Sequence, residues 1–251
     1  MELSDPRFLL FAAIVLLAFV TEAATGFGAT VITLTLAAHF LRVDLILPVF
    51  VPVGLVLSVV IVARQRAHVD GALLSRSVLP LMGAGVAIGL AVFDHVSSAG
   101  LRLALGVFVV AVALQGLWQL RPRPAGGAAD ARPPLPAAVR GAALVGAGVI
   151  HGLFASGGPL LVWALGRSAL GKGAFRATLS SVWLIFGVVL VASYAWRGLL
   201  GADSLRASAA LLPVLALALA LGERLHHRLD ELRFRRVVYA LLLVAGLTNV
   251  F

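Results

Sequence analysis

Residues 22–30, EAATGFGAT, and residues 151–159, HGLFASGGP, each interrupt a long apolar stretch of the chain. The second run follows the first at an offset of 129 residues (151 − 22), which pairs Glu22 with His151 and Gly28 with Gly157. Glycine adopts backbone conformations that end a helix, and proline suits the first turn of the next one. At membrane depth, irregular backbone must be buried in protein or line a cavity. Paired breaks in two halves of one chain are typical of a substrate site in a membrane transporter.

The composition places these stretches in a lipid bilayer. Hydrophobic residues make up 61% of the 251 residues and charged residues 12%, whereas soluble domains carry about 25% charged residues. Several uncharged stretches approach the ~20 residues that cross a ~30 Å hydrocarbon core. The predicted fold class is an all-α integral membrane protein with eight hydrophobic segments, which are 8–41, 45–63, 77–93, 103–120, 141–166, 177–196, 207–222 and 237–251.

The basic residues indicate how the segments are threaded through the bilayer. One straight helix over 8–41 would be about 51 Å long, too long for one crossing, whereas a break near Gly28 allows a hairpin. If 8–41 and 141–166 are both broken hairpins, one side holds five of the twenty basic residues and the other side fifteen. Single crossings divide them ten and ten, so the positive-inside rule favours hairpins with both termini outside and the central loop in the cytoplasm. Two short full crossings in place of each hairpin give the same count.

The predicted organisation is two inverted repeats, residues 1–120 and 138–251, each a hairpin followed by three helices. The Pro- and Gly-rich run 121–137 between them predicts a solvated cytoplasmic linker. The later parts of the two halves match at an offset of 133, which aligns Gly83–Trp118 with Ala216–Phe251. The alternative is that any two leucine- and alanine-rich helices align passably. The recurring breaks and the central linker favour a duplication.

Three features together resemble the sulfite exporter TauE/SafE family: the glycine-rich break in each half, the run Ala174-Phe-Arg-Ala-Thr-Leu-Ser-Ser181, and the recurring Gly…Asp/His…Arg…Gly pattern. The likeness covers nearly the whole chain. It implies a multi-pass permease of a bacterial inner membrane that moves small anions, chiefly sulfite, organosulfonates and related sulfur oxyanions. The resemblance therefore predicts a small sulfur-containing anion as the solute.

The predicted substrate site lies where the two hairpins turn. Helix arms that start near Gly28 and Pro159 would present unpaired N–H groups and the positive ends of two helix dipoles to one anion. The alternative is that the glycines only let helices pack closely. The residues predicted to bind substrate are Thr25, Gly26, Phe27, Gly28, Thr30, Ser156, Gly157, Gly158, Arg176 and Thr178. For Arg176 a topology-setting role at a helix end, and for Thr178 a helix-tying role, are the alternatives.

Glu22 and His151 are predicted to couple proton movement to anion passage. A charge deep in a bilayer costs about 2.5–3.5 kcal/mol or more, so such a residue usually faces a polar cavity or takes up a proton. The alternative is a neutral Glu22 hydrogen-bonded between helices. No cofactor or metal is predicted, and with no cysteine in the chain thiolate metal sites are excluded. The net charge of +9 resides in short loops, where it sets topology and does not indicate nucleic acid as a partner.

Two other functions are compatible with parts of the pattern. Ser156 with His151 nearby suggests an intramembrane serine hydrolase, although a spacing of five residues is poor for a pair on one helix face. A membrane assembly protein that transports nothing is the other alternative. The sequence favours a transporter over both.

Overall fold

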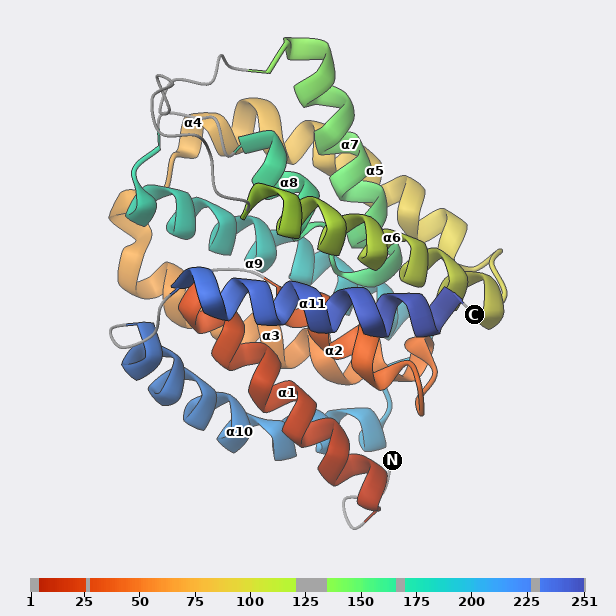
Figure 1. The fold of residues 1–251 in the computed structure, drawn as a ribbon. Coiled ribbons are helices and arrows are strands. Elements are labelled where there is room, and N and C mark those ends of the chain that lie inside the picture. Colours follow the sequence, from red (N-terminus) through yellow and green to blue (C-terminus); the bar gives the residue numbers. More distant parts are fainter. Residues whose placement is uncertain (1–4, 26–27, 121–134, 166–169, 227–230, 251) are drawn as a thin grey trace.

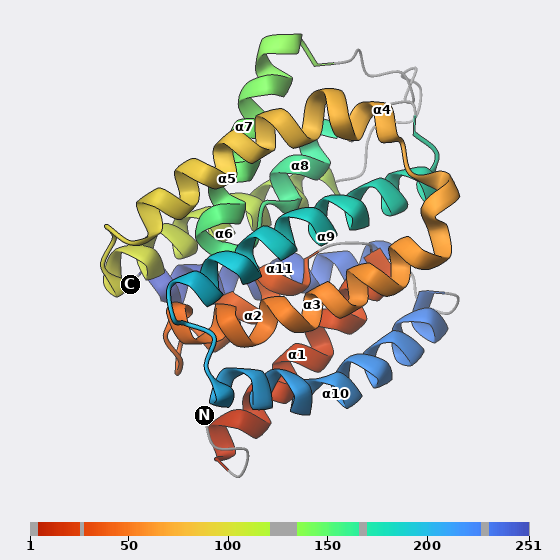
Figure 2. The same ribbon diagram turned by 180° about the vertical axis from the view of Figure 1, so that it is seen from behind.

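The computed structural model describes residues 5–25, 28–120, 135–165, 170–226 and 231–250, and within these residues the regular structure is helical (Figures 1 and 2). Among the described residues, seven helical spans are long and apolar enough to cross a membrane; in two of them consecutive helices join, α3 with η1 and α4 with η2 and α5. The prediction of an all-α integral membrane protein is confirmed. The helices are α1 (Pro6–Thr25), α2 (Ala29–Ala37), α3 (Val43–Gln65), η1 (Arg66–His68), α4 (Gly71–Leu73), η2 (Leu74–Val78), α5 (Leu79–Phe93), α6 (Ser98–Gln119), α7 (Ala137–Phe154), α8 (Gly158–Leu165), α9 (Lys172–Trp196), α10 (Ala202–His226) and α11 (Glu231–Val250).

Two of the apolar stretches are each divided between two helices. The stretch 8–41 contains α1 and α2, and 141–166 contains α7 and α8. The arms are unequal: α1 has 20 residues and α2 has 9, or about 30 and 14 Å at ~1.5 Å per residue. Each hairpin therefore pairs one arm that is long enough to cross the bilayer with one arm of half that length.

Local capping explains why the helices extend beyond the apolar stretches. Asp5 accepts a hydrogen bond from the Arg7 N–H at 2.8 Å, and Pro6 occupies the first position of α1, where its missing N–H costs nothing. Ser97 likewise accepts from the Gly100 N–H at 3.1 Å, so α6 begins at Ser98. Apolarity alone marks the lipid-facing length of a helix, whereas the capping residues fix where the helix begins.

The helices pack in pairs that join the two halves of the chain. The most extensive contacts are α5 with α7, α6 with α11, α1 with α10, and α3 with α9. The long arm of each hairpin thus packs on a helix from the other half. Both figures show α3 and α9 side by side through the middle of the bundle, with α1 and α10 on one flank and α5 and α7 on the other (Figures 1 and 2).

Glycines bring α5 and α7 into direct backbone contact. A Cβ added to Gly85 would fall on the Val145 carbonyl oxygen, and one added to Gly148 on the Met82 carbonyl oxygen. Gly89 and Gly152, one turn further along, meet the facing helix in the same way. Small residues at this spacing let membrane helices approach closely. The crossing places the His151 end of α7 against α5.

Both termini lie at one end of the bundle, on the right in Figure 1, together with the α2–α3, α5–α6 and α9–α10 connections. Polar contacts join the helices at this end. Asn249 on α11 donates to the Thr35 carbonyl of α2 at 3.0 Å and accepts from the Arg102 Nε of α6 at 3.2 Å. Arg197 pairs with Asp94 at 2.7 Å, which ties the end of α9 to the end of α5. The half-length helix α2 is therefore held near its C-terminal end by α11.

Candidate functional site

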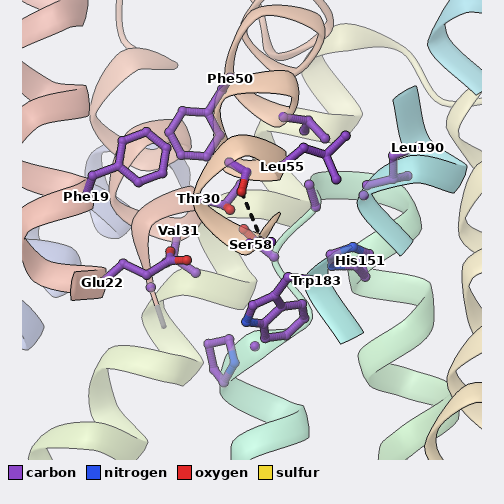
Figure 3. A pocket seen from close by; sticks show the side chains of 18 residues that line it. Phe19, Glu22, Thr30, Val31, Phe50, Leu55, Ser58, His151, Trp183 and Leu190 are labelled. Carbon is purple, nitrogen blue, oxygen red and sulfur yellow. Dashed lines mark hydrogen bonds between the residues drawn. The ribbon is translucent and has the colours of Figure 1, made fainter. Parts of the chain in front are cut away.

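A cavity of about 60 Å³ lies between the two hairpins and the central helices α3 and α9 (Figure 3). One water needs about 10–15 Å³ of such space, so the cavity holds roughly four to six waters or a compact anion. Its lining residues are Phe19, Glu22, Gly28, Thr30, Val31, Phe50, Val51, Gly54, Leu55, Ser58, His151, Ala155, Ser156, Gly158, Pro159, Trp183, Gly187 and Leu190.

On the α1–α2 side, a glutamate caps the second arm of the hairpin. Gly28 is the N-cap residue of α2 and adopts φ 107° and ψ −9°, a left-handed conformation that favours glycine. Because this glycine has no side chain, another group must satisfy the first N–H of α2. The Glu22 carboxylate does so, accepting a hydrogen bond from the Ala29 N–H at 2.9 Å from seven residues upstream. The break thus brings a carboxylate from α1 onto the positive end of the α2 dipole.

On the α7–α8 side, the corresponding polar groups have no partner. Ala155 takes the left-handed conformation (φ 50°) and donates its N–H to the His151 carbonyl at 2.7 Å, which ends α7. The Ser156 Oγ and both ring nitrogens of His151 are buried and make no hydrogen bond. The His151 ring instead stacks on Trp183, with ring centroids 5.4 Å apart. Figure 3 shows Glu22 and His151 entering the cavity from opposite sides.

The central helices supply residues that sequence reasoning missed. Phe50 on α3 stacks on Phe19 of α1 at 4.9 Å between ring centroids, and Ser58 donates to the Gly54 carbonyl at 3.1 Å. The offset of 133 that aligns the later parts of the two halves also pairs Phe50 with Trp183 and Gly54 with Gly187. All four of these residues line the cavity. Extending that alignment into α3 and α9 is the signal that identifies them.

The structure brings six of the predicted site residues to the cavity and leaves others away from it. The cavity is lined by Glu22, Gly28, Thr30, His151, Ser156 and Gly158. Gly157 instead packs against the Ala147 carbonyl oxygen, and the buried Thr178 hydroxyl accepts a hydrogen bond from the Asp70 N–H at 3.0 Å. Arg176 is half-buried near the start of α9 and is not among the lining residues. Thr25 is the last residue of α1. Gly26 and Phe27 lie outside the described residues.

Ser156 and His151 do not form a nucleophile–base pair. A serine nucleophile is activated by a base within hydrogen-bond reach, and neither the Ser156 Oγ nor a ring nitrogen of His151 has a hydrogen-bond partner. The geometry therefore gives no support to the hydrolase alternative.

Long apolar helices that enclose a cavity with buried polar groups define a multi-pass membrane protein with an internal polar site. The model of the sulfite exporter TauE/SafE family matches residues 10–248, and the chain belongs to this family. The predicted membership is confirmed. The family is one of transporters, so the protein is a membrane transporter and not an enzyme, with an anion as its substrate and a bilayer as its environment. Comparisons with the curated proteins and with the solved structures found no match.

Proposed function

We propose that this protein moves a small sulfur oxyanion, such as sulfite or a small organosulfonate, out across a bacterial inner membrane, and that the anion binds in the cavity between the hairpins. The observation that carries the proposal is that two polar side chains among the described lining residues are buried without a partner. Ser156 is 3% exposed and His151 is 4% exposed, and both line the cavity. Polar groups buried without a partner cost free energy, and a transported anion would satisfy them.

The chemistry of the cavity suits a compact anion. The Leu161 N–H is bonded to the Gly157 carbonyl, so the earlier N–H groups of α8, those of Gly158 and Leu160, have no carbonyl within their own helix. Pro159 between them has no N–H. Of these groups, Gly158 lines the cavity, and its N–H, the Ser156 hydroxyl and an N–H of His151 are donors that the oxygens of sulfite or a sulfonate can accept. The aromatic walls, Phe19 with Phe50 and Trp183, would face the less polar side of the ligand.

We also propose that the two halves are inverted repeats, 1–120 and 138–251, joined by the linker 121–137, of which residues 121–134 lie outside the described residues. The contact of α1 with α10 is the counterpart of the contact of α7 with α5, while α3 pairs with α9 and α6 with α11. A two-fold relation between the halves produces this pattern of contacts. It would direct the N-termini of α2 and α8 toward one locus from opposite sides of the membrane.

The loss of one donor should weaken anion binding. With purified protein in liposomes, we expect efflux of sulfite and methanesulfonate. Ser156→Ala should raise the half-saturating sulfite concentration by about 10-fold, because a hydrogen bond to a charged group contributes ~1.5 kcal/mol to binding. Ser75→Ala, an exposed serine bonded to the Gly71 carbonyl outside the cavity, is the control and should leave it unchanged. Wild-type protein that moves no anion under any gradient contradicts the proposal and supports the assembly-protein alternative.

Proton coupling through Glu22 and His151 is part of the proposal. These are the ionisable side chains among the described lining residues. We expect Glu22→Gln to remove most of the dependence of methanesulfonate flux on a pH gradient, because a sulfonate stays anionic across the physiological range and cannot cause that dependence itself. A Glu22→Gln protein with the full wild-type dependence would remove Glu22 from the coupling.

The proposed orientation places both termini in the periplasm and the linker 121–137 in the cytoplasm. The chain has no cysteine, so single introduced thiols can be labelled without background. In intact spheroplasts a membrane-impermeant maleimide should label Gly201→Cys, in the α9–α10 connection, and should label Ala67→Cys, in the α3–α4 connection, only after lysis. The opposite pattern of labelling reverses the orientation.

A further inference from the structure

The two half-length helices differ in what satisfies their first N–H groups. At α2 the Glu22 carboxylate accepts from the Ala29 N–H at 2.9 Å. At α8 the residue that corresponds to Glu22 is His151, whose ring nitrogens have no partner, and the Ser156 Oγ, five residues further along the chain, has none either. On the α2 side of the cavity the helix N-terminus is thus bonded to the Glu22 carboxylate, while the α8 side presents buried donors without an acceptor.

The position of the Glu22 carboxylate is not that of an ordinary helix cap. A helix is normally capped by the side chain of the N-cap residue itself, which here is a glycine in the left-handed conformation. The carboxylate instead comes from the other arm of the hairpin and lines the cavity, as Figure 3 shows. Helix N-termini bind carboxylates, sulfates and phosphates through the same N–H groups and the same dipole. The Glu22 carboxylate therefore occupies the N-terminus of α2, which is one of the two helix N-termini that could bind an oxyanion in the cavity.

We propose that Glu22 is an internal ligand of the anion site: its carboxylate holds the N-terminus of α2 between transport events and gives it up when the transported anion binds. The inference rests on the proposed function. Two negative charges repel strongly when they are only a few ångströms apart and screened from water. The Ala29 N–H is already bonded to the carboxylate at 2.9 Å, so an oxyanion can take that N–H only after Glu22 has released it. Binding of the solute and release of Glu22 are then one event, and release changes the contact between α1 and α2.

The test compares anion binding by wild-type, Glu22→Ala and Glu22→Gln proteins, purified as the full chain and titrated calorimetrically with sodium sulfite at fixed pH and ionic strength. Both variants remove the negative charge of Glu22, which should tighten sulfite binding about tenfold or more, since one repelling charge in a partly buried site is worth at least that factor. Glu22→Gln keeps the shape of the side chain and a neutral acceptor for the Ala29 N–H. It therefore carries the test even where Glu22→Ala folds poorly.

A small carboxylate added in solution separates displacement from simple repulsion. Sodium formate should occupy the place vacated in Glu22→Ala and compete with sulfite there. The formate concentration that halves sulfite binding should be at least about tenfold lower in Glu22→Ala than in wild-type or Glu22→Gln protein, where the side chain still fills that place. Equal competition by formate in all three proteins overturns the inference.

The two proposals fail in different ways. Folded variants that bind sulfite no more tightly than the wild type overturn the internal ligand and leave the anion site standing, with Glu22 as a structural cap. Wild-type protein and variants that all fail to bind sulfite or methanesulfonate overturn the proposed function itself.

Discussion

Gly54→Leu will strongly weaken anion transport in liposomes while the protein still folds. Gly54 lies on α3 and lines the cavity, and a Cβ added there has nothing within 4 Å. A leucine side chain therefore extends into the space of about 60 Å³ that the anion needs. Overfilling a packed site costs about 1–3 kcal/mol or more, so apparent affinity should fall about 5- to 150-fold or beyond measurement. Leucine favours a helix over glycine by up to ~1 kcal/mol, so stability should not fall.

The matched control is Gly71→Leu. A Cβ at Gly71 also has open space around it, but this exposed residue lies in α4 at the end of the bundle and is not among the lining residues. It should transport like the wild type. Gly54→Ala adds one methyl group and should reduce flux by a smaller factor than Gly54→Leu. If the Gly54→Leu protein has a normal melting temperature and transports the anion at the wild-type rate, the anion does not pass through this cavity.

Gly54 is a cleaner probe than the glycines of the two breaks. Gly28 has a positive φ of 107°, so every L side chain there strains the backbone as well as filling space. A Cβ at Gly157 would meet the Ala147 carbonyl oxygen and disturb the packing of α7. A loss of transport at either residue cannot separate a blocked site from a distorted hairpin.

The two breaks, and the position of Glu22 and His151 at an internal cavity, followed from the sequence because the physical signals there are strong. Glycine, proline and the excess length of the 8–41 stretch require an interruption, and an ionisable residue deep in an apolar segment must face a polar space. The hydrogen bond from the Ala29 N–H to Glu22 could not be predicted in this way. It depends on how the two arms of a hairpin meet, which no local pattern encodes.

The contribution of the central helices was harder to predict for a related reason. Apolar side chains in a membrane helix face lipid, a neighbouring helix or a cavity with almost the same composition. Phe50 and Trp183 therefore do not differ in type from residues that face lipid. Thr178 shows the reverse problem: a hydroxyl near the predicted site is used by the Asp70 N–H, 108 residues away in the sequence. Tertiary partners of this kind decide between a ligand contact and a helix tie.

The largest effect on folding should come from the crossing of α5 and α7. The glycines at this crossing let a carbonyl of each helix lie against a Cα of the other, and a Cβ on Gly85 would fall on the Val145 carbonyl oxygen. The obstacle is backbone and not the end of a flexible side chain, so the helices must separate. Gly85→Ala should cost at least the ~1–3 kcal/mol of an overpacked core. Gly85→Leu should prevent the pair from docking, which would be measured as the loss of a monodisperse peak in detergent.

Gly83→Ala provides the comparison within the same helix. An added Cβ at Gly83 lies 3.7 Å from the ring of Phe186, an ordinary contact, so the substitution should be neutral or slightly stabilising through helix propensity. Gly141→Ala serves the same purpose for Gly148→Ala on α7, since its Cβ would lie 3.9 Å from the Leu81 side chain. Because α7 carries His151 and leads to Ser156, Gly85→Ala and Gly148→Ala should also weaken sulfite binding. Equal melting temperatures for Gly85→Ala and Gly83→Ala would mean that α5 and α7 separate at no cost, and the crossing would then not be what holds His151 at the cavity.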